Sequence, residues 1–216
     1  MNLTKRLPVA PLNVLFIGNS FTARNDIPGL IAQLATARGK QLHHRLMQAG
    51  GASLRMHWNK GEAQQAMQQT RYDYVVLQEQ STLPIKNPTR MHENIRLFDQ
   101  AIKDSGAKTA LYLTWARQNA PESQAAISQA YTTIGAELGA RVVPVGIAWQ
   151  NFLAQHKLPM LHDKDQSHPT VAGSYLAACV FFAALFDENP EGIACDRLTQ
   201  AETELLQGAA WATVQK

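Results

Sequence analysis

Short apolar runs alternate with segments of helical spacing along nearly the whole sequence. The strand-like runs occupy residues 13–18, 41–48, 72–78, 108–115 and 141–146, and Pro144 in the last run indicates an edge strand or the end of the strand. Helical spacing covers residues 26–39, 53–69, 89–105, 121–138, 170–186 and 200–212, and one further helix follows the fifth run. Strands separated by single helices pair in parallel through right-handed crossovers. The sequence therefore predicts a three-layer α/β/α fold of the flavodoxin-like kind, with a five-stranded parallel sheet.

Composition favours one domain spanning residues 1–216. Hydrophobic residues make up 45% and charged residues 17%, which is typical of a globular chain with a substantial core. The 20 basic and 17 acidic residues are interleaved and leave a net charge of +3, with no basic stripe. We therefore expect no nucleic-acid partner, and the oligomeric state is left open.

The ends of the chain and its cysteines say little about the compartment. Lys5 and Arg6 precede an apolar stretch that prolines interrupt, so we interpret it as a short leader before the first strand. No stretch is long enough for a membrane span. Cys179 lies in an apolar helix and is expected in the core, although a disulfide with Cys195 stays open. We expect a cytoplasmic protein, or a periplasmic or secreted one if a signal peptide has been removed.

Small and polar residues gather where the predicted strands end. These segments are 18–22, 49–53, 78–81 and 115–117, together with the late loop 162–169. In parallel α/β sheets the reacting groups lie beyond the carboxyl ends of the strands. This edge of the sheet is the predicted site.

Three residues at this edge predict a nucleophilic mechanism. Ser20 lies at a strand-to-helix turn, where its hydroxyl faces the crevice. A hydroxyl needs a base to remove its proton, and His168 is the natural base. Asp165, three residues earlier, can hold the imidazole in the required tautomer. Backbone N–H groups at Ser20 and in the Gly50-Gly51 turn, with a glutamine amide, could form an oxyanion hole.

The order of these blocks resembles that of the SGNH, or GDSL-type, hydrolases. GNSFT, the Gly50-Gly51 turn, LQEQS and DQSHP correspond to the family's blocks in sequence order, over residues 13–186. The resemblance is greatest to a branch whose first block reads Gly-Asn-Ser-Phe-Thr. It implies Ser20, Asp165 and His168 as the catalytic residues.

The resemblance also implies an oxyanion hole and a surrounding substrate site. Its donors would be the N–H groups of Ser20 and Gly51 and the side chain of Gln80. Gln80 takes the position of the usual asparagine, and its extra methylene moves the amide outward. The residues expected near the substrate are Asn19, which replaces the more usual aspartate, Gln78 and Trp115.

Several residues keep alternative readings. The site could instead hold a metal through His162, Asp163, Asp165 and His168, and Asp163 could replace Asp165 as the acid. Trp115 and Arg117 fit a pocket lining, and equally a core tryptophan and a surface arginine. Glu79 could orient a loop or bind a substrate hydroxyl. Ordinary structural roles are expected for His43 and His44, and surface or boundary positions for His57 and His92.

The sequence thus predicts a serine esterase or deacylase that uses no cofactor and no metal. Its substrate would be a small acyl ester, with an acetyl ester on a carbohydrate as the first choice by resemblance. One alternative is a catalytically weakened ligand-binding module of the same fold. Another is a phosphate- or nucleotide-binding flavodoxin-like protein, which the lack of a P-loop or dinucleotide fingerprint disfavours.

Overall fold

The computed structural model describes residues 10–215, so Lys5 and Arg6 of the expected leader lie outside the described residues. A five-stranded parallel sheet forms its centre, with the strand order β2-β1-β3-β4-β5. The strands are β1 (Leu12–Gly18), β2 (Leu42–Gln48), β3 (Tyr74–Leu77), β4 (Lys108–Tyr112) and β5 (Arg141–Val143). The predicted fold class is confirmed.

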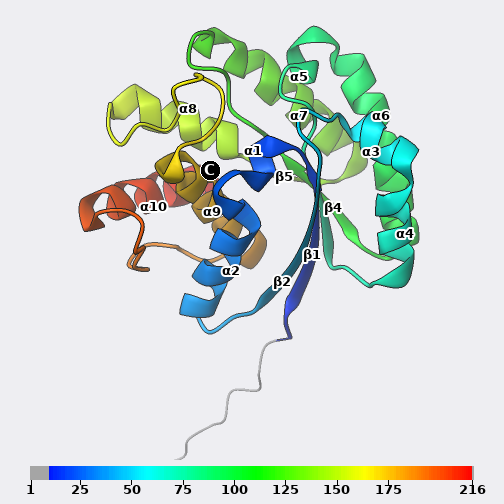
Figure 1. Ribbon diagram of the computed structural model, residues 1–216, viewed down its shortest axis with the longest axis horizontal. Helices are drawn as coiled ribbons and strands as arrows, with labels where there is room; N and C mark the ends of the chain where they lie inside the picture. The colour runs from blue at the N-terminus through cyan, green and yellow to red at the C-terminus, as the bar shows by residue number, and fades with distance from the viewer. Residues whose placement is uncertain (1–9, 216) are drawn as a thin grey trace, which may run out of the picture.

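Helices cover both faces of the sheet (Figure 1). One layer holds α2 (Ile27–Ala37), α8 (Val145–Gln155), α9 (Val171–Phe186) and α10 (Gln200–Val214). The other holds α3 (Leu54–Lys60), α4 (Glu62–Gln69), α6 (Pro88–Asp104) and α7 (Gln124–Leu138). Two short helices, α1 (Ser20–Ala23) and α5 (Leu83–Lys86), follow β1 and β3 in the chain. Two 3-10 turns, Arg24–Asp26 and Pro121–Ser123, precede α2 and α7.

Alternate residues of β1 face the two helical layers. Val14 and Phe16 lie in one core, and Leu15 and Ile17 in the other, because successive strand side chains point to opposite faces. All four are fully buried, as expected for a strand covered on both faces. Helix α9 is apolar on nearly every side because α2, α8 and α10 all pack against it.

Several predicted elements have different boundaries in the structure, and two of the differences have a clear local cause. The predicted helix 53–69 is divided into α3 and α4 at Gly61, whose φ of 75° lies in the left-handed region that glycine adopts without strain. The predicted strand 141–146 ends at Val143, and α8 begins at Val145. Pro144 lies between them because proline has no N–H for a strand ladder but suits the start of a helix.

Two further expectations concern a disulfide bond and membrane-spanning helices. Cys179 is fully buried, as predicted, and Cys195 is half-buried. Both are free thiols, so the disulfide that the sequence left open is not formed. Within residues 10–215, every helix is too short or too polar to cross a membrane.

Candidate active site

Ser20 is the first residue of α1 and follows β1 after a single residue. Asn19 caps the helix, since its Oδ1 accepts the N–H of Phe21 at 3.0 Å. A Cβ on Gly18 would lie 2.6 Å from Oε1 of Gln78, so only glycine leaves room for that amide. The small residue before the turn is therefore required by close packing beneath it, and the turn presents the Ser20 hydroxyl at the carboxyl edge of the sheet.

Ser20, His168 and Asp165 form a continuous hydrogen-bonded chain. Ser20 Oγ lies 2.8 Å from Nε2 of His168, and Nδ1 of His168 lies 2.5 Å from Oδ2 of Asp165. A carboxylate only accepts hydrogen bonds, so Nδ1 carries the proton, which leaves Nε2 free to accept the serine proton. The structure thus brings together the three residues that the sequence predicted, in the order needed for proton transfer.

The carboxyl group of Asp165 is held by the backbone as well as by the imidazole. Its Oδ1 accepts the N–H groups of His168 at 2.9 Å and Ser167 at 3.0 Å. The pKa of Asp165 is lowered well below its ordinary value, first by the His168 N–H and then by the His168 side chain. Asp165 is therefore ionised whenever the protein is near neutral pH.

The loop that carries Asp165 and His168 is braced at three places. Asp163 N–H donates to the His168 carbonyl at 2.8 Å, and Gln118 N–H donates to the Gln166 carbonyl at 2.9 Å. Gln166 has a φ of 61°, which turns the chain sharply between the two triad residues. Directly after His168, Pro169 pairs with His162 in an antiparallel bridge. The triad geometry thus rests on backbone contacts within the loop and with the segment after β4.

Arg24 links the serine side of the site to the acid side, a contact that the sequence did not suggest. Its guanidinium lies 3.2 Å from Oδ2 of Asp163 and 3.8 Å from Oδ2 of Asp165. These residues are far apart in the chain, so no local pattern announces the contact. Asp163 therefore pairs with Arg24, whereas Asp165 is the carboxylate that contacts the His168 side chain.

Asn25, in the 3-10 turn after α1, forms hydrogen bonds with the residues that follow His168. Its Nδ2 donates to the carbonyls of Pro169 (3.3 Å) and Thr170 (3.1 Å) and to Oγ of Ser174 (2.9 Å). Its φ is 57°, a conformation in which asparagine is enriched among residues with side chains. The adjacent Asn25 and Asp26, soon after Ser20, are the local sequence signal for this turn, because both residue types favour turns.

The backbone N–H groups of Ser20 and Gly51, which the sequence predicts as oxyanion donors, have no hydrogen-bond partner among the described residues. Gly51 is exposed, has a φ of 64° and has open space where a Cβ would lie. Asn19 joins the two loops that carry these groups, since its Nδ2 donates to the Ala52 carbonyl at 3.1 Å. Neither N–H group is therefore used by the hydrogen bonds that hold these two loops together.

The amide oxygen of Gln80 accepts hydrogen bonds from its own loop, whereas the amide nitrogen does not donate within it. Oε1 accepts the N–H of Thr82 at 2.9 Å, its hydroxyl at 3.0 Å, and the N–H of Leu83 at 3.1 Å. No described residue accepts a hydrogen bond from Nε2. Because the oxygen is anchored, the orientation of the amide is fixed and Nε2 is the atom left to act as a donor.

The three residues expected near the substrate, Asn19, Gln78 and Trp115, are buried side chains that bind neighbouring parts of the protein. All three are at most 2% exposed. Asn19 joins two loops, and Gln78 Oε1 accepts the Asn19 N–H at 2.8 Å. Trp115 stacks between Phe21 and Trp149 at ring distances of 4.8 and 4.0 Å. Residues at strand ends are covered by the loops that follow them, so these side chains support the site from beneath.

Two other expectations concern histidines. His57 is buried, not at the surface or a boundary, and its Nε2–H donates to the Gly18 carbonyl at 2.7 Å, with burial lowering its pKa. His162 is also buried and donates through Nε2 to the Ala116 carbonyl at 3.0 Å. Within residues 10–215, no three His, Cys, Asp or Glu side chains converge as metal ligands would.

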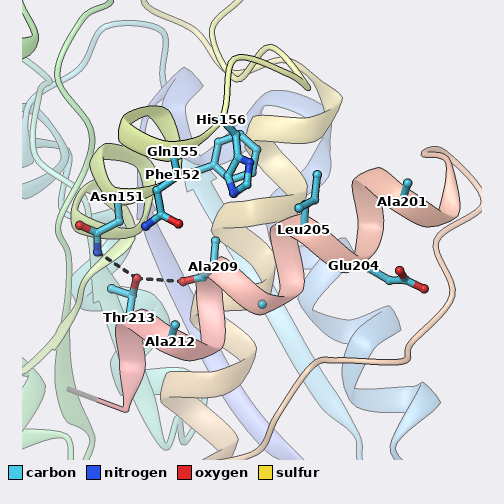
Figure 2. A pocket seen from close by; sticks show the side chains of 11 residues that line it. Asn151, Phe152, Gln155, His156, Ala201, Glu204, Leu205, Ala209, Ala212 and Thr213 are labelled. Atoms are coloured by element: carbon cyan, nitrogen blue, oxygen red, sulfur yellow. Dashed lines mark hydrogen bonds between the residues drawn. The ribbon is translucent and has the colours of Figure 1, made fainter.

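A groove of about 650 Å³ lies elsewhere on the molecule, between α8 and α10 (Figure 2). Phe152 and Leu205 contribute to its walls, and a hydrogen bond of 3.4 Å from Asn151 to Thr213 crosses one end. None of the predicted site residues lines it. The predicted site residues therefore lie at the carboxyl edge of the sheet and not in this groove.

Solved structures resemble this chain, whereas no protein-family model and no curated protein matches it. A protein from Slackia heliotrinireducens, assigned to the SGNH hydrolases, is 26% identical over 82% of this chain and 100% of its own, with a TM-score of 0.72. A DUF4886 family protein from Bacteroides uniformis is 18% identical over 95% of each chain, with a TM-score of 0.79.

An acetylxylan esterase from Geobacillus stearothermophilus is 17% identical over 80% of this chain and 93% of its own, with a TM-score of 0.65. At these identities the second and third structures show a shared fold alone. The first adds a closer likeness in sequence over its whole length. The resemblance predicted from the order of the sequence blocks is confirmed.

Proposed function

Since this chain belongs to the SGNH-type hydrolase superfamily, we propose that it is a serine esterase or deacylase that acts through an acyl-enzyme. The observation that carries the proposal is the unbroken chain from Ser20 Oγ through the His168 imidazole to the Asp165 carboxylate. Each contact has the length of a hydrogen bond, and the proton on Nδ1 leaves Nε2 as a base. This arrangement is suited to making a serine hydroxyl nucleophilic.

The reaction follows from these contacts in two halves. His168 accepts the Ser20 proton while Oγ attacks the ester carbonyl, and the protonated imidazole then gives that proton to the leaving alcohol. In the second half, His168 takes a proton from water, whose oxygen attacks the acyl-enzyme. The carboxylic acid leaves, and the proton returns to Ser20. Asp165 stabilises the imidazolium in both halves through its Oδ2.

The negative charge on the carbonyl oxygen needs donors that are in place before the reaction. The free N–H groups of Ser20 and Gly51 are two such donors, and Nε2 of Gln80 is the third that we propose. Gln80 differs from the usual asparagine, but its anchored Oε1 removes the freedom that a longer side chain would otherwise have. The substitution is therefore compatible with an active oxyanion hole.

We propose a small acyl ester as the substrate, with an acetyl ester on a carbohydrate as the first candidate. The triad is open to solvent, because the His168 side chain is 29% exposed and that of Asp165 is 47% exposed. A bulky polar alcohol could reach such a site. The similarity in fold to an acetylxylan esterase is a further support for this substrate class.

A fluorophosphonate probe and p-nitrophenyl esters test the proposal together. We expect the wild type to be labelled and to hydrolyse the acetate faster than the octanoate. Ser20→Ala should abolish labelling and lower kcat by about a thousandfold or more, as for other triad serines. Ser105→Ala, at the opposite edge of the sheet, is the control and should behave as the wild type.

Three outcomes would contradict the proposal. Turnover that persists in Ser20→Ala would place the nucleophile elsewhere. Turnover that a chelator abolishes and that is indifferent to Ser20 would favour metal-dependent hydrolysis. A wild type that neither reacts with the probe nor hydrolyses any ester of the series would favour the ligand-binding module.

A further inference from the structure

Glu79 is a fully buried carboxyl group that the proposed mechanism does not use. It follows β3 in the third block, and its exposed fraction is 0%. The pKa of Glu79 is raised because of burial, and hydrogen bonds from Asn94 and from two backbone N–H groups offset part of that rise. Burying a carboxylate costs free energy unless hydrogen-bond donors occupy its oxygens. The donors around Glu79 therefore indicate its role.

The two oxygens of Glu79 accept three hydrogen bonds from three different segments. Oε1 accepts the N–H of Leu54 at 3.0 Å and the N–H of Gln80 at 2.7 Å. Oε2 accepts Nδ2 of Asn94 at 2.8 Å. Asn94 is itself oriented by Arg55, whose Nε donates to its Oδ1 at 2.9 Å. Every group that faces Glu79 in these contacts is a donor, which is the environment that an ionised carboxylate requires.

The two backbone groups that share Oε1 belong to the two loops with oxyanion donors. Leu54 begins α3, three residues after Gly51. Gln80 N–H is the backbone of the residue whose side chain would be the third donor. One oxygen atom therefore connects the Gly51 loop to the Gln80 loop from beneath the crevice.

We propose that Glu79 is the positioning residue of the oxyanion hole, setting the distance between the Gly51 N–H and the Gln80 amide. It touches neither substrate nor reacting atoms and acts only through Leu54 and Gln80. This inference rests on the proposed esterase function. Oxyanion donors are effective only when they are preorganised, so a small loosening of either loop lowers the rate without changing the ground-state affinity.

A reversal of hydrogen-bond polarity tests the proposal. Glu79→Gln replaces one acceptor oxygen by an NH₂ group, which then faces either the Asn94 amide or a backbone N–H. Asn94→Asp alone places two carboxylates against each other. In the double variant, the new glutamine NH₂ donates to the new aspartate, which also accepts from Arg55. The double variant therefore restores a matched pair where each single variant has a mismatch.

The expected result is a fall in kcat of about tenfold to a hundredfold in Glu79→Gln, somewhat less than removal of a whole oxyanion donor. KM should stay within about twofold, because the lost interaction belongs to the transition state. The double variant should recover most of kcat. Glu93→Gln, an exposed carboxyl on α6 beside Asn94, is the matched control and should leave kcat unchanged.

Hydrogen–deuterium exchange supplies a readout that does not depend on activity. We expect faster exchange in Glu79→Gln across residues 49–54 and 79–83, and wild-type exchange in the double variant. Unchanged exchange in both loops, or a single variant with full kcat, would overturn the inference. If the wild type shows no Ser20-dependent turnover, the proposed function fails, and the exchange experiment still decides whether Glu79 joins the two loops.

Discussion

Asp165 has separate tasks for its two oxygens. Oδ2 accepts the imidazole N–H of His168, and Oδ1 accepts the backbone N–H groups of Ser167 and His168. The backbone contacts fix the carboxylate before it orients the ring. Because the pKa is lowered in the folded state, the contribution of Asp165 to stability is present above its ordinary value of 3.8 and is lost as the pH falls through the lower folded value.

Asp165→Asn should lower kcat for p-nitrophenyl acetate by about a thousandfold to ten-thousandfold. An amide has one acceptor oxygen, so its NH₂ must face either the imidazole Nδ1 or the two backbone N–H groups. The first orientation imposes the wrong tautomer, and the second loosens the loop. Steady-state kinetics and thermal melts at neutral pH measure the two effects.

Asp163→Asn is the control for this experiment. Asp163 pairs with Arg24 and does not contact the imidazole. We expect its kcat to fall by no more than about threefold, as for loss of an exposed ion pair. Equal losses in the two variants would contradict the assignment of Asp165 as the acid of the triad.

At the scale of single elements, the start of α9 has to fit closely against its neighbours because His168 lies just before it. Thr170 caps the helix, and its Oγ1 accepts the Gly173 N–H at 3.1 Å. A Cβ on Gly173 would lie 2.4 Å from the Leu161 carbonyl oxygen and 2.5 Å from the Trp149 ring. Glycine at this position lets α9 pack closely against Leu161, just before the loop that carries Asp165 and His168, and against Trp149.

Gly173→Ala should therefore destabilise the protein by about 1–3 kcal/mol, the range for overpacked sites. Gly208→Ala on α10 is the matched control, since the nearest atom to its Cβ would be Glu191 Oε1 at 3.5 Å. That variant should gain about 0.5–1 kcal/mol from the higher helix propensity of alanine. Urea denaturation measures both free energies of unfolding, and a stabilising Gly173→Ala would show that the predicted close contact is absent.

In the whole molecule, α2, α8 and α10 pack around α9 and bury most of its side chains. Cys179, on this helix, is fully buried, and burial raises the pKa of its thiol well above its ordinary value. Cys195 lies between α9 and α10 and is half-buried. As long as this layer stays packed, the Cys195 thiol is therefore more accessible to solvent than the Cys179 thiol.

A thiol reagent such as 5,5′-dithiobis(2-nitrobenzoate) should react with one cysteine in the native protein and with both in guanidinium chloride. Cys195→Ser should leave no thiol that reacts under native conditions. Rapid reaction of Cys179 in the folded variant would mean that α9 is not enclosed as described. Each reacting thiol releases one coloured thiolate from the reagent, so the absorbance of that thiolate gives the number of thiols that have reacted.

Much of the fold and the triad could be predicted from the sequence because they follow from local patterns. Apolar runs of strand length between helical segments require a parallel sheet, and a parallel sheet gathers all its strand ends at one edge. Ser20, Asp165 and His168 could therefore be placed together although the first is far from the other two in the chain. Pro144 also acts locally and indicated the end of an edge strand from the sequence alone, whereas the division of residues 53–69 at Gly61 was not predicted.

Tertiary structure alone decided which polar side chains at that edge face the crevice and which lie beneath it. Asn19, Gln78 and Trp115 follow strands just as Ser20 does, yet neighbouring loops cover them. The contacts of Arg24 and Glu79 likewise join segments that are distant in sequence. The physical reason is that the chain's local periodicity determines where a strand ends, whereas burial and hydrogen-bond partners beyond that end depend on which other loops pack there.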